Sequence, residues 1–134
     1  SSDLISVKIA KEWIPNIIDE IPVLAVAASR ASGKTVIEGA GELRNKESDR
    51  ISALSTQLKK VGVDIREQED GFEIIGNSDS NINGGVVESM GDHRIAMSLA
   101  ILSLLSKNST TILDSDCIDT SFPGFKYILK KLMA

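Results

Sequence analysis

Residues 41–51, Gly-Glu-Leu-Arg-Asn-Lys-Glu-Ser-Asp-Arg-Ile, form the densest charged segment of the chain. The segment holds a carboxylate that can exchange a proton, Glu47, and two cations that can bind an anion, Lys46 and Arg50. Because like charges four residues apart on a helix repel each other, Lys46 and Arg50 favour an anion between them. The segment therefore predicts a phosphate or carboxylate site beside an acid.

An apolar repeat with helical spacing follows this segment, and its members are Ile51, Leu54, Leu58 and Val61. The repeat predicts a helix over residues 45–61, with Asn45 as its N-cap and Gly62 as its stop. The free N–H groups and the positive dipole end of the first turn would add to the attraction for an anion.

On such a helix, Glu47 falls in the centre of the apolar stripe and Asp49 points to solvent. A carboxylate that faces a core needs a partner or a purpose, which favours a functional role for Glu47. The alternative is a solvated first turn in which Glu and Arg side chains pair with one another.

Two more polar groups stand at the start of apolar segments, Asp19 and Asp92. Each could be a plain helix N-cap. Asp92 differs because His93 and Arg94 follow it, which places three polar groups at the start of an otherwise apolar helix. His93 alone would more often be a structural histidine, but beside Arg94 at a helix N-terminus it suits an anion.

Strands and helices are expected to alternate around these residues. We expect strands at residues 5–9, 35–38, 85–88 and 110–113, and a hairpin of residues 63–68 and 72–75 about Glu69-Asp70-Gly71. We expect loops at residues 13–16 and 77–84. Helices at residues 20–32 and 92–106 are apolar on nearly all sides, which predicts that they are buried, and Thr120-Ser121 should cap a last helix.

This pattern repeats in the two halves of the chain, over about residues 5–76 and 85–134. The order is β-α-β-α-β-β and then β-α-β-α, which predicts one partial α/β domain. If the buried helices run parallel, their N-termini meet at one end of the domain. The polar groups gathered there would be Asp19, Lys46, Glu47, Arg50, His93, Arg94, Thr120 and Ser121. A substrate bearing phosphate and carboxylate groups suits such a rim.

Composition argues against several classes of protein. Basic and acidic residues number 15 and 19, the net charge is −4, and the basic residues are scattered, so we expect no nucleic-acid partner. Cys117 is the lone cysteine and His93 the lone histidine, which predicts no disulfide, no metal site and a reducing, cytoplasmic setting. No apolar run approaches about 18 residues, so we expect no membrane span. The chain begins without Met, and we expect it to be a piece of a longer protein.

The run Lys46-Glu47-Ser48-Asp49-Arg50 resembles the signature of the 5-enolpyruvylshikimate-3-phosphate synthase family, the enolpyruvyl transferases of the shikimate pathway. Further matches follow in the right order at residues 19–28, 70–71, 91–97 and 121–125, and together they cover nearly the whole chain. The resemblance implies two domains, each an inside-out barrel of three βαβαββ units around buried parallel helices. This chain would hold about two of the three units of one domain.

The resemblance also implies a reaction. The family transfers the enolpyruvyl group of phosphoenolpyruvate to the 5-hydroxyl of shikimate 3-phosphate, with release of phosphate and without a metal or organic cofactor. Addition and elimination need two carboxylates within reach of the substrates. By resemblance, Asp19 is the proton acceptor that also contacts the shikimate ring, and Glu47 is the second acid.

The resemblance assigns substrate contacts as well. Lys46 matches a contact to shikimate 3-phosphate, Arg50 and Arg94 match contacts to phosphoenolpyruvate, and His93 matches a neighbour of that site. Two positions depart from the pattern, and their roles are not carried over. Glu42 stands where some members have an Asn that touches shikimate 3-phosphate, and Thr120 stands where some have a Lys that binds phosphoenolpyruvate.

The expected active site lies between two domains, so we expect this chain to be inactive alone. The parent protein is expected to be a monomer, and the isolated fragment to be capable of self-association through exposed apolar edges. Two alternatives stay open. One is the related enolpyruvyl transferase that acts on a nucleotide sugar, and the other is a non-catalytic anion-binding or assembly module.

Overall fold

The computed structural model describes residues 6–76, 85–105 and 110–113. Its larger sheet has the order β1-β2-β4-β3, formed by Ser6–Lys8, Gly33–Ile37, Gly71–Gly76 and Asp64–Gln68. β1 is parallel to β2, and the other neighbours are antiparallel. The smaller sheet pairs β5 (Val86–Glu88) with β6 (Thr111–Leu113) in parallel.

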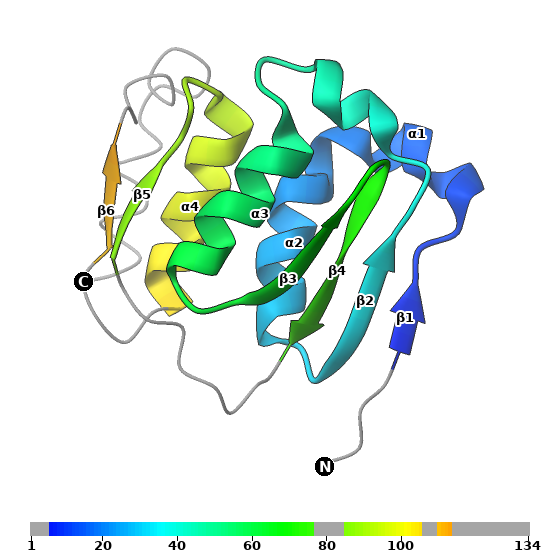
Figure 1. Ribbon diagram of the computed structural model, residues 1–134, viewed down its shortest axis with the longest axis horizontal. Coiled ribbons are helices and arrows are strands. Elements are labelled where there is room, and N and C mark those ends of the chain that lie inside the picture. Colours follow the sequence, from blue (N-terminus) through cyan, green and yellow to red (C-terminus); the bar gives the residue numbers. More distant parts are fainter. Residues whose placement is uncertain (1–5, 77–84, 106–109, 114–134) are drawn as a thin grey trace.

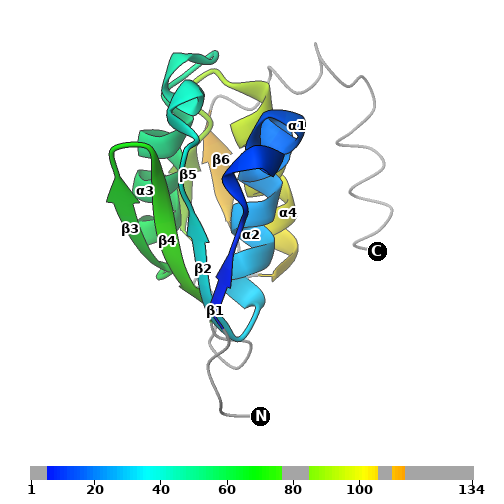
Figure 2. The same cartoon turned by 90° about the vertical axis from the view of Figure 1, so that its right-hand side faces the viewer.

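Three helices lie between the two sheets, namely α2 (Ile21–Arg30), α3 (Arg50–Lys60) and α4 (His93–Leu105) (Figure 1). The chain colours in Figure 1 show that all three begin at the same end of the molecule. α2 packs against both α3 and α4, and Figure 2 shows α2 between the larger sheet and α4. The prediction of an α/β fold with parallel helices is confirmed.

Aliphatic side chains from both sheets and all three helices form the core. The largest of the fully buried side chains are Phe72, Ile21, Ile37, Leu43, Ile51, Leu54, Leu58, Ile65, Ile74, Ile95, Leu99 and Leu102. The apolar repeat of the sequence therefore faces this core, as its spacing predicts. Gly62 has φ +91° directly after the last turn of α3, which fits its predicted role as the stop.

The start predicted for α3, at Asn45, is wrong. A 3₁₀ helix, η3 (Gly41–Asn45), and a bend precede α3, which begins only at Arg50. Its N-cap is Asp49, whose Oδ1 accepts a hydrogen bond from the N–H of Ser52 at 3.0 Å. Asp is as good an N-cap as Asn, and Asp49 also pairs with Arg44. Glu47 therefore lies before the helix rather than on its apolar stripe, and Asp49 does not simply point to solvent.

The hairpin of β3 and β4 and the strands β1, β2, β5 and β6 lie where they are predicted. Residues 13–16 are not a loop, because η1 (Lys11–Trp13), α1 (Ile14–Ile17) and η2 (Ile18–Glu20) form a chain of short helices there. Pro15 lies in the first turn of α1, where its missing N–H costs nothing. The predicted loop at residues 77–84 and the predicted last helix lie outside the described residues.

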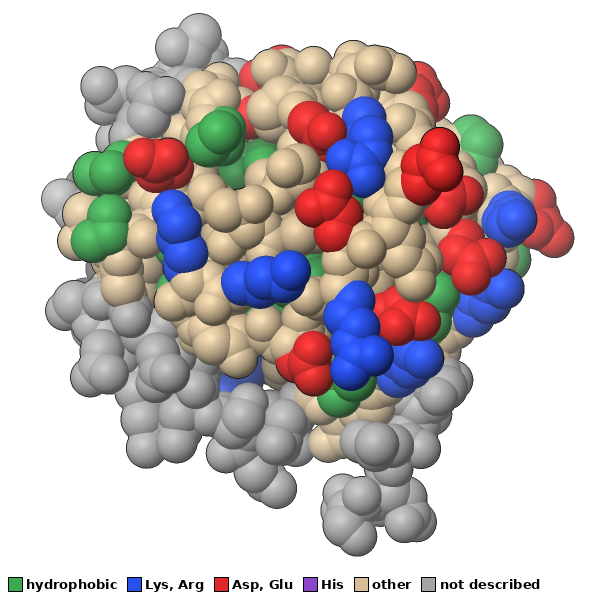
Figure 3. Space-filling model, viewed as in Figure 1, with side chains coloured by type: hydrophobic (Ala, Val, Ile, Leu, Met, Phe, Trp, Pro, Cys, Tyr) green, Lys and Arg blue, Asp and Glu red, His purple; other side chains and the backbone are tan. Residues whose placement is uncertain are grey.

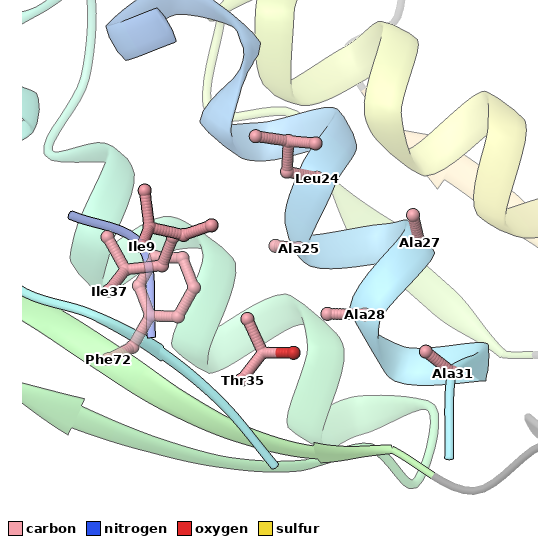
Figure 4. Close-up of a pocket in the computed structure, with 9 residues that line it drawn as sticks. All are labelled: Ile9, Leu24, Ala25, Ala27, Ala28, Ala31, Thr35, Ile37 and Phe72. Carbon is pink, nitrogen blue, oxygen red and sulfur yellow. The ribbon is translucent and has the colours of Figure 1, made fainter. Parts of the chain in front are cut away.

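One face of α2 is less buried than its composition predicts. Val23 and Leu24 are each 39% exposed, and Ala27 is exposed as well. An apolar cavity of about 200 Å³ lies between this helix and the larger sheet (Figure 4). Its lining comprises Ile9, Leu24, Ala25, Ala27, Ala28, Ala31, Thr35, Ile37 and Phe72. An all-apolar helix sequence is therefore not enough to show that every face is covered.

Charged side chains of both signs alternate over the face shown in Figure 3, where acidic and basic groups lie next to one another. Lys34 of β2 and Glu73 of β4 form an ion pair across neighbouring strands, at 3.2 Å. Within the described ranges, no helix is long and apolar enough to cross a membrane.

Gly71 provides a test of how closely β2 and β4 approach. A Cβ atom at Gly71 would lie 1.8 Å from the carbonyl oxygen of Ile37. We expect Gly71→Ala to lower the free energy of unfolding by about 2 kcal/mol, since backbone must move to admit the methyl group. Gly85→Ala is the control, because its Cβ would meet nothing within 4 Å. Denaturant unfolding of both variants checks this, and equal stabilities would contradict the packing.

Candidate active site

The candidate site lies at the end of the molecule where α2, α3 and α4 begin. Asp92 is the N-cap of α4, and its Oδ1 accepts hydrogen bonds from the N–H groups of Arg94 at 2.9 Å and Ile95 at 3.4 Å. Asp92 is therefore a helix N-cap, one of the two roles that the sequence left open for it. The same carboxylate also reaches across to the first residue of α3.

Arg50 and Asp92 form a buried ion pair between α3 and α4. Nε of Arg50 donates to Oδ2 of Asp92 at 2.8 Å, and Nη2 donates to Oδ1 at 3.2 Å. The exposed fraction is 3% for the Arg50 side chain and 0% for that of Asp92. Ser48 adds a hydrogen bond from its Oγ to Oδ2 at 2.9 Å. A planar guanidinium held through two bonds has a fixed orientation.

The pKa of Asp92 lies below its ordinary value of 3.8. Burial acts to raise this pKa, because it disfavours the charged form. The hydrogen bonds from Arg50 and Ser48, the charge of Arg50 and the backbone N–H of Arg94 act together in the opposite direction and prevail. Asp92 is therefore an anion at neutral pH, held in place by its donors.

Asp19, in η2, faces Arg50 and Lys46. Nη1 of Arg50 donates to Oδ1 of Asp19 at 3.3 Å, and Nζ of Lys46 lies 4.0 Å from the same oxygen. Lys46 also donates to Oε1 of Glu42 at 3.5 Å. Lys46 and Arg50 thus both lie near the carboxylate of Asp19, although Lys46 lies before the helix.

Glu47 and His93 form a further pair of the site. Nδ1 of His93 lies 2.7 Å from Oε1 of Glu47, and the N–H of His93 donates to Oε2 at 3.4 Å. The Glu47 side chain is 46% exposed, so the prediction that it faces the core is wrong. Its partner comes from α4, and its carboxylate is accessible from solvent. Arg94 lies next to this pair in sequence and contacts Glu20, with Nη1 to Oε1 at 3.7 Å.

Arg44 anchors the segment that carries Lys46 and Glu47. The Arg44 guanidinium donates to Asp49 at 2.9 Å, to Glu67 at 3.0 Å and to the carbonyl oxygens of Gln68 and Glu69 at 2.8 Å. The hydrogen bonds of Asp49 and Glu67 raise the pKa of Arg44. This arginine therefore joins the bend before α3 to the β3–β4 hairpin.

In the part of the chain that the structure describes, one group of residues could reach a single metal ion. The ligand atoms of Glu47, Asp92 and His93 lie within 4.8 Å of one another. Both oxygens of Asp92 already accept hydrogen bonds from Arg50, and a cation placed there would face that guanidinium at close range. The donor set therefore fits an ion pair better than a metal.

Comparison with known proteins gives the family. A sequence model of EPSP synthase (3-phosphoshikimate 1-carboxyvinyltransferase) matches residues 2–129. The chain belongs to the EPSP synthase family. It is 54% identical over 133 residues to the 3-phosphoshikimate 1-carboxyvinyltransferase of Petrotoga mobilis and 52% identical over 130 residues to that of Alkaliphilus metalliredigens. These alignments cover 98% and 97% of this chain.

The EPSP synthase fold is also evident from solved structures. The EPSP synthase of Acinetobacter baumannii superposes with a TM-score of 0.89 and 40% identity, covering 94% of this chain and 29% of that one. The chain spans about 30% of the length of the two sequence relatives. It therefore corresponds to part of an EPSP synthase, as the sequence predicts.

The structure brings together the six predicted site residues Asp19, Lys46, Glu47, Arg50, His93 and Arg94, whose functional roles stay predictions. Thr120 and Ser121 lie outside the described residues. Sequence reasoning missed the pairing of Asp92 with Arg50 and the bracing role of Arg44. The pairing joins residues 42 positions apart, so no local pattern signals it. For Arg44, the only signal was its place in the charged segment.

The Arg50–Asp92 pair predicts a pH-dependent stability. Asp92→Asn should lower the free energy of unfolding by about 3 kcal/mol at neutral pH, because it leaves the buried Arg50 poorly compensated. The folded-state pKa of Asp92 lies below the unfolded value of 3.8. This contribution is therefore present above pH 3.8 and is lost as the pH falls through the folded-state pKa.

Urea unfolding of the unmodified chain and of Asp92→Asn, over a pH series from neutral to below 3.8, checks this prediction. The difference in the free energy of unfolding between the two proteins should become smaller at the acidic end of the series. A difference that stays constant over the whole series would contradict it.

Proposed function

We propose that this chain is part of an enzyme that transfers the enolpyruvyl group of phosphoenolpyruvate to the 5-hydroxyl of shikimate 3-phosphate and releases phosphate. One observation carries the proposal. Two accessible carboxylates, Asp19 and Glu47, lie among three cations, Lys46, Arg50 and Arg94, at the shared N-terminal end of three helices. Membership of the EPSP synthase family supports it.

The cations suit the two substrates, which both carry phosphate. Lys46 is proposed to contact shikimate 3-phosphate, and Arg50 and Arg94 are proposed to contact phosphoenolpyruvate, whose carboxylate matches a guanidinium fork. Because Arg50 is almost fully buried, we infer that an anion meets it at the Nη1 end, next to Asp19.

The carboxylates suit the proton transfers. Addition forms a C–O bond between the 5-hydroxyl oxygen and the enol carbon that bears the phosphate, while the terminal carbon takes up a proton. Asp19 is proposed to accept the hydroxyl proton, and Glu47, beside His93, to serve as the second acid. Elimination then removes a proton from the same terminal carbon, and the C–O bond to phosphate breaks.

The site in this chain is proposed to be one part of a larger one, since the chain spans about 30% of its relatives. The remainder of the parent enzyme would supply further phosphate contacts, so we expect the chain alone to bind weakly and to be inactive. A non-catalytic anion-binding module and an enolpyruvyl transferase for a nucleotide sugar are the competing possibilities, which the following measurements separate.

Turnover of the full-length protein tests the carboxylates. We expect Asp19→Asn and Glu47→Gln each to reduce kcat by about 10² to 10⁴, the usual contribution of a positioned acid or base. Glu67→Gln is the matched control, because Glu67 is also a half-exposed carboxylate in an ion pair, with Arg44. Unchanged turnover in both test variants would favour a non-catalytic module. Activity only with a nucleotide-sugar acceptor would replace the proposed substrate.

Ligand binding by the isolated chain tests whether its part of the site is preformed. We expect shikimate 3-phosphate, at about millimolar concentration, to shift the backbone amide NMR signals of residues 19, 46–50 and 92–94 in a saturable way. Shikimate is the control without phosphate and should shift them less. Equal shifts with both ligands would contradict a phosphate-selective site, and no shift would mean that the remainder of the enzyme must build it.

A further inference from the structure

We propose that Asp92 is a positioning residue that sets both arginines of the phosphoenolpyruvate subsite, Arg50 through its side chain and Arg94 through its backbone. The inference rests on the proposed function and adds a residue to it. Asp92 is fully buried, so it does not touch a substrate and acts only through its partners.

The hold on Arg50 leaves one end of the guanidinium for a ligand. Nε and Nη2 donate to the two oxygens of Asp92, and Nη1 donates to Asp19. Arginine has five N–H bonds in a rigid plane, so two of them, on Nη1 and Nη2, have no acceptor among the described residues. Asp92 thus orients the Nη1 end of the guanidinium toward Asp19.

Asp92 positions Arg94 through a hydrogen bond to its backbone at the start of α4. Oδ1 of Asp92 accepts the N–H of Arg94 at 2.9 Å, which fixes the first turn of the helix and the point where the Arg94 side chain departs. Ser48 holds the other oxygen, Oδ2, at 2.9 Å. One carboxylate therefore fixes α3 and α4 relative to each other at the place where both arginines begin.

Asp92 also keeps Arg50 from binding Asp19 too strongly. Asp19 is the next acceptor of Arg50, at 3.3 Å. Without the charge of Asp92, the buried guanidinium has Asp19 as its only carboxylate partner in the described part of the chain, and the pair would tighten. An anion would then have to displace a stronger partner. Lys46, the proposed contact to the other substrate, has no described contact with Asp92.

Steady-state kinetics of the full-length protein test this inference. We expect Asp92→Asn to raise KM for phosphoenolpyruvate at least tenfold, which corresponds to about 1.4 kcal/mol, and to change KM for shikimate 3-phosphate less than threefold. Asp64→Asn is the control. It makes the same substitution in another Asp–Arg pair, with Arg66 in β3, and it should change neither KM by more than twofold.

A second variant separates positioning from a general structural effect. Asp92→Asn should change KM for phosphoenolpyruvate less than twofold when Arg50→Lys is already present, because the guanidinium fork is then gone and an Asn side chain can still accept the N–H of Arg94. If Asp92→Asn does not fold, Ser48→Ala replaces it in the same double-mutant comparison with Arg50→Lys. Ser48→Ala removes one hydrogen bond to Asp92 without a change of charge. We then expect about a threefold rise in KM for phosphoenolpyruvate that vanishes beside Arg50→Lys.

Equal rises in both KM values, or effects that multiply fully with Arg50→Lys, would overturn the inference while leaving the proposed function intact. An unchanged KM for phosphoenolpyruvate in a folded Asp92→Asn protein would overturn it as well. Absence of turnover in the unmodified full-length protein would overturn the proposed function and this inference together.

Discussion

The buried ion pair of Arg50 and Asp92 is the interaction on which the rest of the site depends. Removing two charges from water is costly, and the cost is met only when geometry and additional hydrogen bonds are good. Here both oxygens of Asp92 are occupied, by Arg50, Ser48 and the N–H groups that open α4. The pair thereby fixes where α3 and α4 begin relative to each other. The positions of the accessible side chains near these helix ends depend on that arrangement.

Around this pair, some polar residues fix the geometry of the site and others present accessible carboxylates. Arg44 clamps the bend before α3 onto the hairpin, so Lys46 and Glu47 sit on a braced segment instead of a loose one. Glu47 and Asp19, the accessible carboxylates, each contact a basic side chain from a different element. Contacts between elements far apart in sequence define the site more than any one motif does.

Periodic and turn signals in the sequence predicted the hairpin, the end of α3 and the start of α4, because those features depend on local chemistry. They failed at the start of α3, where Asn45 and Asp49 are equally good N-cap types and the cap is Asp49, which also pairs with Arg44. Placing Glu47 in the core followed from that error. The partner of Arg50 could not be predicted, since Asp92 lies 42 residues away. The exposed face of α2 shows that composition alone does not report what surrounds a helix.

The parallel course of α2, α3 and α4 has an electrostatic consequence at a distance. Each helix carries about half a positive elementary charge at its N-terminus, and all three ends point to the same side of the molecule. The same end also carries the carboxylates of Asp19, Glu47 and Asp92. The three helix ends therefore offset part of the negative charge that these carboxylates gather in one place, and dissolved salt weakens this effect for the accessible groups by screening it.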